Sequence, residues 1–275
     1  MSSICVRVEH LGKRFMIPRT HRTTLRALQA TLRGEPLRSE LWVLQDVSFE
    51  IATGTCTALI GRNGSGKTTL LRLLAGIIEP TTGILDVRDA PRPLFSTSVG
   101  FVRELSVADN VYLFGAVHGM QRRQLAPRHA DIVRAAGIEH LTHAALKDLS
   151  MGQVQRLALS VFAETSDRFL VFDEVLGNVD RGYARRADRF FRSLGESGRT
   201  VVMTSHDAQF LRAYCPRAIW IDAGQVRMDG PFDDVMREYE RACDEDDVAA
   251  AANGGVDAEE ANGAGPAARA MADPS

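Results

Sequence analysis

Residues 61–68 constrain this chain more than any other part of the sequence. They read Gly-Arg-Asn-Gly-Ser-Gly-Lys-Thr, which fits the pattern G-x-x-x-x-G-K-[ST] of loops that bind nucleotide phosphates. The apolar run 55–60 before them predicts a buried strand, and the leucine-rich run 69–75 after them predicts a helix. A chance glycine-rich turn is the alternative, but it explains neither the lysine nor the flanking strand and helix. The sequence therefore predicts a phosphate-binding loop.

The residue types of this loop suit a nucleotide and a hard metal ion. Glycines allow the backbone N–H groups to curl around phosphate oxygens, and the helix that follows adds the positive end of its dipole. Lys67 would reach the β- and γ-phosphates, and the Thr68 hydroxyl would bind Mg²⁺. The candidate nucleotide-binding residues here are Gly61, Asn63, Gly64, Ser65, Gly66, Lys67, Thr68 and Thr69.

Composition indicates a globular protein of a reducing compartment. The chain of 275 residues can form one large domain or two small ones, and its 45% hydrophobic content is ordinary for a packed protein. The four cysteines are scattered and give no metal or disulfide signal. Residues 1–9 lack a signal-peptide pattern, and no apolar run reaches the ~18 residues of a membrane-spanning helix. We therefore expect a soluble chain whose membrane role comes through a partner.

Charge is divided unevenly along the chain. The net charge is −2, but residues 242–275 alone carry −7, which leaves +5 on the rest. The arginines of the body are spread out, which favours a solvated or membrane-proximal surface over a nucleic-acid interface. Because the tail has almost no large apolar residues, it predicts disorder over residues 241–275 and a folded domain over 1–240.

Apolar patterns place the remaining elements. Strands are predicted over residues 4–9, 41–51, 84–87, 169–172, 200–204, 218–222 and 225–228. Helices are predicted over residues 107–118, 127–136, 141–147, 154–163, 184–194 and 232–239. The helix-rich stretch of about 105–165 interrupts the alternation of strands and helices, so we interpret it as an inserted subdomain.

Two features near the amino terminus each have two interpretations. Phe15 could stack on an adenine ring, or it could be an ordinary core residue at a strand end. The amphipathic stretch 21–42, with Leu25, Leu28 and Leu32 at helical spacing, could lie on a membrane surface or a partner subunit. It could equally be a surface helix that packs its leucines on the core.

Polar residues follow two of the predicted buried strands. The run 169–174 ends in Asp173 and Glu174, and the strand 200–204 is followed by His206. Ligands bind at the carboxyl ends of strands in parallel sheets, so these side chains are candidates for the same site as the phosphate loop. A strand that simply ends in charges, or a structural histidine, is the alternative.

The order of these motifs resembles the nucleotide-binding domain of ABC transporters over about residues 4–239. Residues 61–68 match its Walker A motif, and residues 169–174 match its Walker B motif with the glutamate that follows. Residues 149–153 resemble the signature motif LSGGQ, with Met151 in place of the first glycine. The resemblance implies an α/β fold: a P-loop (RecA-like) ATPase core with an N-terminal antiparallel β subdomain and an inserted α-helical subdomain.

The resemblance also implies roles for single residues. Glu174 would orient or deprotonate the attacking water, His206 would be the switch histidine, and Asp173 would hold Mg²⁺ through water. Phe15 matches the adenine-stacking aromatic, and residues 177–180 stand where the D-loop is expected. Two chains would meet head to tail around two ATP molecules, so that each Walker A motif faces the other chain. The residues contributed across that dimer would be Ser150, Gly152, Gln153 and Asp180.

One subgroup resembles the chain more than the rest: the ATPases that export O-antigen, capsule and teichoic-acid-type polysaccharides. The insertion before residues 41–49 and the segments 100–105, 110–113 and 173–176 are similar to theirs. The resemblance implies a peripheral subunit on the cytoplasmic face of the bacterial inner membrane, bound to an integral membrane permease near the helical subdomain and residues 95–105. Some of these exporters carry a further carbohydrate-binding domain at the carboxyl end, which we expect to be absent here.

Two departures from the family pattern bear on activity. The family usually has a glutamine about eight residues before the position of Leu105, where this chain has Phe-Ser-Thr-Ser at 95–98. Met151 places a bulky side chain where the backbone must approach a γ-phosphate. Alternatives are therefore an ABC-type ATP-binding switch with weak hydrolysis, or an ABC-2 type exporter of another substrate. A soluble ABC ATPase acting on DNA or ribosomes is disfavoured, because the chain has one cassette and no sustained heptads.

Overall fold

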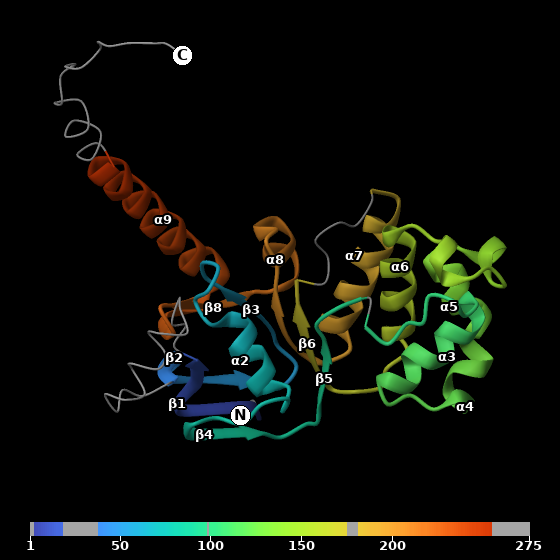
Figure 1. The fold of residues 1–275 in the computed structure, drawn as a ribbon, viewed down its shortest axis with the longest axis horizontal. Helices are drawn as coiled ribbons and strands as arrows, with labels where there is room; N and C mark the ends of the chain where they lie inside the picture. Colours follow the sequence, from blue (N-terminus) through green and yellow to red (C-terminus); the bar gives the residue numbers. More distant parts are fainter. Residues whose placement is uncertain (1–2, 19–37, 98, 175–180, 255–275) are drawn as a thin grey trace, which may run out of the picture.

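The computed structural model describes residues 3–18, 38–97, 99–174 and 181–254, which form two β-sheets with helices around them (Figure 1). The smaller sheet has the strand order β2-β1-β4 and is antiparallel. Its strands are β1 (Ile4–Pro18), β2 (Arg38–Ala52) and β4 (Thr82–Val87). β1 and β2 stay paired beyond the end of β4, as far as Pro18 opposite Arg38.

The larger sheet has six strands in the order β5-β6-β7-β3-β8-β9. Five of them are parallel, and β9 pairs antiparallel with β8 as a hairpin. The strands are β3 (Cys56–Ile60), β5 (Pro91–Leu94), β6 (Phe169–Asp173), β7 (Thr200–Thr204), β8 (Arg217–Asp222) and β9 (Gln225–Pro231). The carboxyl ends of β3, β6 and β7 therefore meet at one edge, as the sequence predicted.

The larger sheet lies between two apolar layers. In β6, Leu170 and Phe172 pack into one layer, while Phe169 and Val171 pack into the other. The second layer also contains the leucines of α2 (Lys67–Leu74) and the inward residues of β1 and β2. α2 is thereby held between the two sheets, and this packing fixes where the phosphate loop stands.

The helices between β5 and β6 form the part of the molecule on the right in Figure 1. They are α3 (Val107–Val117), α4 (Arg122–Leu125), α5 (His129–Ala136) and α6 (Met151–Phe162), with 3₁₀ turns at Ala126–Arg128, Glu139–Leu141 and Leu146–Asp148. Buried Asn110 fixes the start of α3, because its amide exchanges hydrogen bonds with backbone groups of Val102, Leu105 and Ser106. The predicted fold class is confirmed, with its antiparallel β subdomain and inserted helices.

The described residues form three more helices: α7 (Arg181–Glu196), α8 (Ala208–Tyr214) and α9 (Phe232–Gly254). α9 begins directly after β9, buries Phe232 and Val235, and then projects away from the body of the molecule (Figure 1). Among the described residues, no helix combines the length and the apolar character needed to cross a bilayer.

The helix predicted over residues 141–147 is wrong. This segment has a turn between two 3₁₀ turns, because part of its backbone bonds to residues at the start of α3. Val107 N–H donates to the Ala144 carbonyl, and Leu146 N–H donates to the Leu105 carbonyl. No element was predicted from the sequence for α4, β5 or α8.

The carboxyl-terminal helix is longer than the sequence predicted. α9 continues through residues 241–254, where composition indicated disorder. Four consecutive alanines at 249–252 favour helix, and Arg241 pairs with Glu238 and Glu245 at helical spacing. The predicted boundary at residue 240 therefore falls inside this helix. Residues 255–275 and most of the predicted amphipathic stretch, residues 19–37, lie outside the described residues.

Candidate active site

The phosphate loop packs closely against β8 and β2. Gly61 has φ +146°, and a Cβ there would lie 2.1 Å from the Ile221 carbonyl oxygen. Gly66 has φ +108°, and its Cβ would lie 2.7 Å from the Leu44 side chain. Both positions require glycine for conformation and for space. The Gly224 N–H adds a hydrogen bond to the Ser65 carbonyl at 3.1 Å, so the loop is anchored to the β8–β9 turn.

The start of α2 offers backbone donors to an anion. Its N-cap is Gly66, which supplies no capping side chain, and its first turn contains no acidic residue. The first N–H groups of a helix have no acceptor within the helix, and the helix dipole makes that end positive. This arrangement fits a bound phosphate.

Lys67 lies over the same loop. Its ammonium group donates to the carbonyl oxygens of Gly61 at 2.6 Å and Arg62 at 2.9 Å. Burial lowers the pKa of the Lys67 ammonium, and the nearby charges of Glu174 and Asp173 oppose that shift. A cation is therefore held between the loop and the acidic end of β6.

Thr204 positions the two carboxylates at the end of β6. It pairs in register with Asp173, and its hydroxyl donates to Asp173 Oδ1 at 2.7 Å. The Glu174 N–H donates to the Thr204 hydroxyl at 3.1 Å. Glu174 has φ +53°, a left-handed conformation that non-glycine residues adopt at an energetic cost. The hydrogen bond that Glu174 donates to Thr204 holds Glu174 in this conformation. The conformation of the Glu174 backbone in turn sets the direction of its carboxylate.

His206 completes the arrangement from the loop after β7. Its Nε2 lies 3.0 Å from Glu174 Oε1, and both side chains are partly exposed. A cavity of about 110 Å³ brings these groups together with the phosphate loop. Its lining includes Gly61, Lys67, Glu174, Ser205, His206, Met236 and Tyr239. The structure thus gathers a cation, a carboxylate and an imidazole at one edge of the larger sheet.

Comparisons with known proteins decide the family. Residues 44–177 match the family model described as ABC transporter. The chain is 30% identical over 199 residues to the O-antigen export system ATP-binding protein RfbB of Klebsiella pneumoniae, covering 72% of this chain and 81% of that protein. The chain belongs to the ABC transporter family.

Two further relatives of this ABC chain are also named as export ATP-binding proteins. The teichoic acids export ATP-binding protein TagH of Lactococcus lactis is 25% identical over 240 residues, which is 87% of this chain and 51% of that protein. RfbB of Myxococcus xanthus is 29% identical over 230 residues, 80% of this chain and 53% of that protein. The chain thus spans about half the length of these two relatives. The predicted likeness to the polysaccharide-export subgroup is confirmed.

Solved structures support the fold. An ATP-binding subunit of an ABC transporter superposes with a TM-score of 0.66 at 19% identity, covering 86% of this chain and 93% of that one. A dimeric ATP-binding cassette in a post-hydrolysis state with ADP and Pi superposes with a TM-score of 0.65 at 20% identity, covering 82% and 98%.

The segment 149–153, which resembles the ABC signature motif, lies outside the cavity that holds Lys67 and Glu174. Ser150 is the N-cap of α6, and it forms a capping box with Gln153: the Ser150 N–H donates to Gln153 Oε1 at 2.8 Å. A Cβ on Gly152 would meet no atom of the described residues within 4 Å, so the backbone there is open to approach. α6 stands among the helices on the right of Figure 1, whereas α2 lies on the left. The structure therefore does not bring these residues to the chain's own phosphate loop.

The other predicted site residues have mixed outcomes. Phe15 is 37% exposed, with the Lys13 ammonium 5.2 Å from its ring centroid. The core interpretation expected burial, so exposure favours the stacking interpretation, which stays a prediction. Asp180 lies outside the described residues, as does Ser98 of the segment that replaces the glutamine.

Three residues of the site were not singled out from the sequence. Thr204 holds both carboxylates in place, and the polar residue that ends an apolar strand was the available signal. Met236 and Tyr239 of α9 line the cavity beside Lys67 and His206. No sequence pattern links α9 to the phosphate loop. The contact depends on the position in the sheet of the hairpin β8–β9, because α9 begins directly after β9.

Proposed function

We propose that the chain is the ATP-hydrolysing subunit of an ABC exporter that powers translocation of a polysaccharide or lipid-linked glycan through a partner membrane permease. The observation that carries this proposal is the cavity that joins Lys67, Glu174 and His206 at the carboxyl edge of the sheet. Relatives of the chain are named as ATP-binding proteins of O-antigen export and of teichoic acids export, which supports a glycan as the substrate.

The arrangement suits hydrolysis of the γ-phosphate by water. Phosphoryl transfer needs positioning and charge stabilisation more than covalent chemistry. The α2 amides and Lys67 would hold the phosphates and offset the charge that develops on them. Glu174 would accept a proton from the attacking water, and the His206 imidazole, 3.0 Å away, would orient that carboxylate.

Thr68 and Asp173 fit a magnesium ion. A hydroxyl and a carboxylate are hard oxygen donors, and Mg²⁺ is usually held by one or two carboxylates together with substrate phosphates. The Thr204 hydroxyl donates to one oxygen of Asp173 and so fixes the carboxylate, which would hold Mg²⁺ through water. When bound, Mg²⁺ would neutralise charge on the phosphates.

A second copy of the chain would complete each site in a head-to-tail dimer. The start of α6 presents an exposed helix N-terminus, with Met151 66% exposed and an open Gly152. Such a terminus suits a γ-phosphate bound by another chain. We infer that Ser150, Gly152 and Gln153 serve the partner's nucleotide, and that Asp180 bridges the two chains.

Contact with a permease would use the surface after β5. Four large apolar side chains between residues 99 and 117 are exposed: Val99, Val102, Leu105 and Val117. Exposed apolar side chains that lie close together mark interaction sites. Bound to the permease through this face, the subunit would lie at the cytoplasmic side of the bacterial inner membrane. It would meet the bilayer only through the permease.

Deletion and complementation test this function. Cells that lack the chain should lose their surface glycan and accumulate it inside, and the wild-type chain should restore export. Lys67→Ala, which removes the phosphate-binding ammonium, should not restore it. Normal surface glycan in the deletion strain would reject the export assignment.

An ATP-binding switch with weak hydrolysis is the second candidate. The exposed Met151 in the signature segment favours it, because a bulky side chain there stands where a phosphate must approach. Phosphate release by the chain with and without its permease separates the two: an exporter subunit is stimulated by the permease, whereas a switch stays slow in both.

A further inference from the structure

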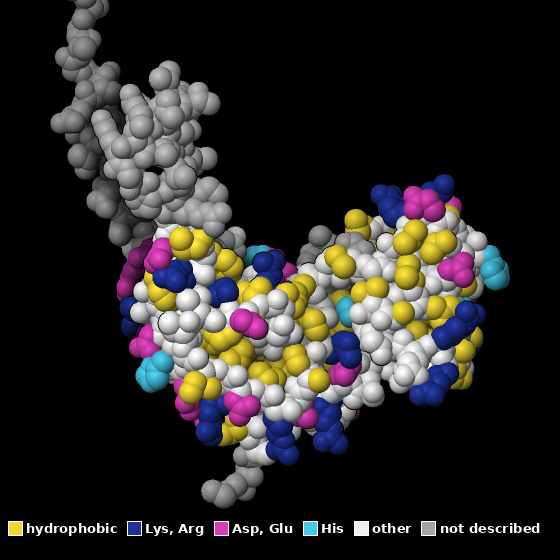
Figure 2. Space-filling view, turned by 60° about the horizontal axis from the view of Figure 1, so that its bottom comes forward, with side chains coloured by type: hydrophobic (Ala, Val, Ile, Leu, Met, Phe, Trp, Pro, Cys, Tyr) yellow, Lys and Arg dark blue, Asp and Glu magenta, His cyan; other side chains and the backbone are white. Residues whose placement is uncertain are grey.

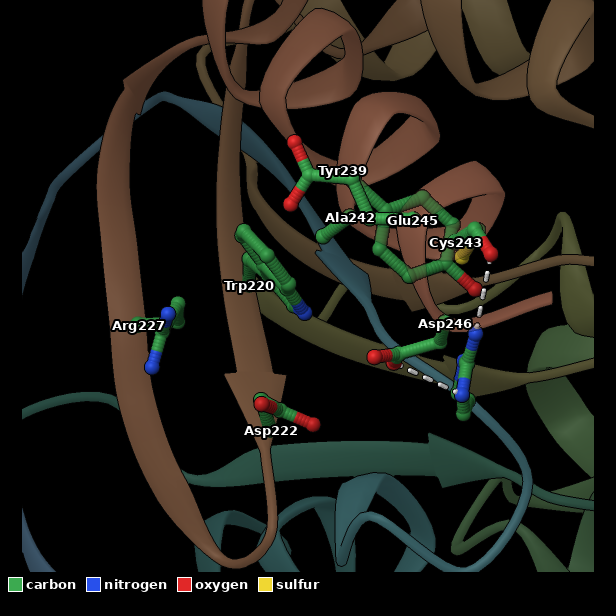
Figure 3. A pocket seen from close by; sticks show the side chains of 9 residues that line it. Trp220, Asp222, Arg227, Tyr239, Ala242, Cys243, Glu245 and Asp246 are labelled. Atoms are coloured by element: carbon green, nitrogen blue, oxygen red, sulfur yellow. Dashed lines mark hydrogen bonds and ion pairs between the residues drawn. The ribbon is translucent and has the colours of Figure 1, made fainter. Parts of the chain in front are cut away.

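The carboxyl-terminal helix α9 lies against the phosphate loop. Its residues Met236 and Tyr239 line the same cavity as Lys67 and His206. One turn further on, α9 borders a second cavity of about 150 Å³, whose lining includes Arg62 of the loop. Figure 3 shows this second cavity between α9 and the β8–β9 hairpin.

Arg62 joins the loop to α9 directly. Its guanidinium lies 3.0 Å from Asp246 Oδ2 and donates to the Cys243 carbonyl at 3.4 Å. Figure 3 marks both contacts with dashed lines. The Arg62 carbonyl accepts from Lys67, so one residue links α9 to the lysine of the phosphate loop.

The two halves of α9 are held differently. The first half is packed: Phe232 and Val235 are buried, and Tyr239 meets Trp220 edge to face at 5.6 Å. Burial, together with the neighbouring Cys243 thiol, raises the pKa of the Tyr239 hydroxyl to about 12, which matches its half-buried place between α9 and β8. Beyond Tyr239, the helix borders the open cavity, and its contact with the loop runs through Arg62.

Arg62 could exchange Asp246 for a phosphate that binds its guanidinium more strongly. Arg62 is 44% and Asp246 66% exposed, and exposed pairs of this kind are weak. A nucleotide triphosphate brings several negative charges to the loop, and guanidinium groups bind phosphate strongly. A phosphate bound at the loop would therefore compete with Asp246 for this one cation.

We propose that α9 is a latch on the phosphate loop: Asp246 holds Arg62, opposes nucleotide binding, and releases the outer half of α9 when nucleotide binds. The latch would make the hold on the outer half of α9 depend on nucleotide occupancy. It rests on the proposed function, since it regulates the same site.

Nucleotide affinity tests the latch. Asp246→Asn should lower the Kd for ATP by about two- to five-fold, because it removes the competing charge of a weak surface pair. The matched control is Glu238→Gln, which removes a carboxylate of α9 that pairs with Arg241 within the helix. The control should leave the Kd within error of the wild type. Equal Kd values for wild type and Asp246→Asn, or equal shifts in both variants, would overturn the proposal.

A second variant and a second readout separate the latch from general charge effects. In an Arg62→Gln background, Asp246→Asn should no longer change the Kd. Hydrogen exchange of residues 239–246 in the purified chain without nucleotide should be faster by two- to five-fold in Arg62→Gln and in Asp246→Asn than in Glu238→Gln. Unchanged exchange would overturn the latch. Failure of the wild-type chain to bind ATP would instead reject the proposed function, and the exchange measurement would still decide the latch.

Discussion

His206 Nε2 lies 3.0 Å from Glu174 Oε1. The two residues come from the loops after neighbouring parallel strands, and the pairing of Asp173 with Thr204 in the same register brings those loops together. Glu174 is held in a left-handed conformation by bonds to Thr204, so its carboxylate is aimed by the backbone and fixed by the imidazole. The two residues are thirty-two positions apart in the chain, and the fold brings them into contact at the edge of the sheet.

His206→Ala should lower the kcat of ATP hydrolysis by about 100-fold while the Kd for ATP changes by less than about three-fold. The imidazole positions Glu174, whereas the phosphates are held by the α2 amides and Lys67. Phosphate release and nucleotide binding would be measured on the same preparation. His140→Ala, at an exposed position in the helical subdomain, is the control and should keep wild-type kinetics.

Mixing two inactive variants tests the head-to-tail dimer. Lys67→Ala removes the phosphate-binding ammonium, and Gly152→Glu places a negative side chain at the signature segment without a steric clash in its own chain. If each site uses Lys67 of one chain and Gly152 of the other, a mixed dimer has one intact site. An equimolar mixture should recover roughly a quarter of wild-type hydrolysis, because half of randomly paired dimers are mixed and half of their sites are intact. A mixture as inactive as its components would contradict the arrangement.

His118 predicts a pH dependence of stability. Its ring packs 4.4 Å from Phe114 and 5.3 Å from Phe162, and burial, with a smaller effect from the charge of Arg92, lowers its pKa from 6.5 to about 4. Between these values the unfolded chain binds the proton and the folded chain does not, so the free energy of unfolding falls as pH drops from 6.5 toward 4.

His118→Phe keeps the ring contacts and removes this titration. Between pH 7 and 4.5 the variant should lose about 1–2 kcal/mol less stability than the wild type, a value reduced to allow for partial exposure of the ring. Urea unfolding at both pH values measures the difference. Equal losses in both proteins would show that His118 titrates normally in the fold.

The sequence predicted the parts of the site that are set by local pattern. The phosphate loop, the acidic end of β6 and the histidine after β7 all follow apolar strands, so their convergence followed from the rule that parallel strands end at one edge. Thr204 was passed over because its role is a hydrogen bond across two strands.

Tertiary contacts explain where sequence reasoning failed. Residues 141–147 have a helical composition, but their backbone bonds to the start of α3, and Ser106 forms a bridge with Ala145. β5 contains two prolines, which hide a strand at the sheet edge, where a missing N–H is tolerated. The contact of α9 with Arg62 joins segments more than 180 positions apart, which no local pattern encodes.

Steady-state phosphate release by Glu174→Gln is the most direct test of the central claim that this site hydrolyses ATP with Glu174 as the group that activates water. The substitution keeps the size of the side chain and its backbone bonds but removes the base. The kcat should fall by about 100-fold or more, while ATP still binds and the ATP-bound dimer stays stable on size-exclusion chromatography. Hydrolysis by Glu174→Gln at the wild-type rate would contradict this claim.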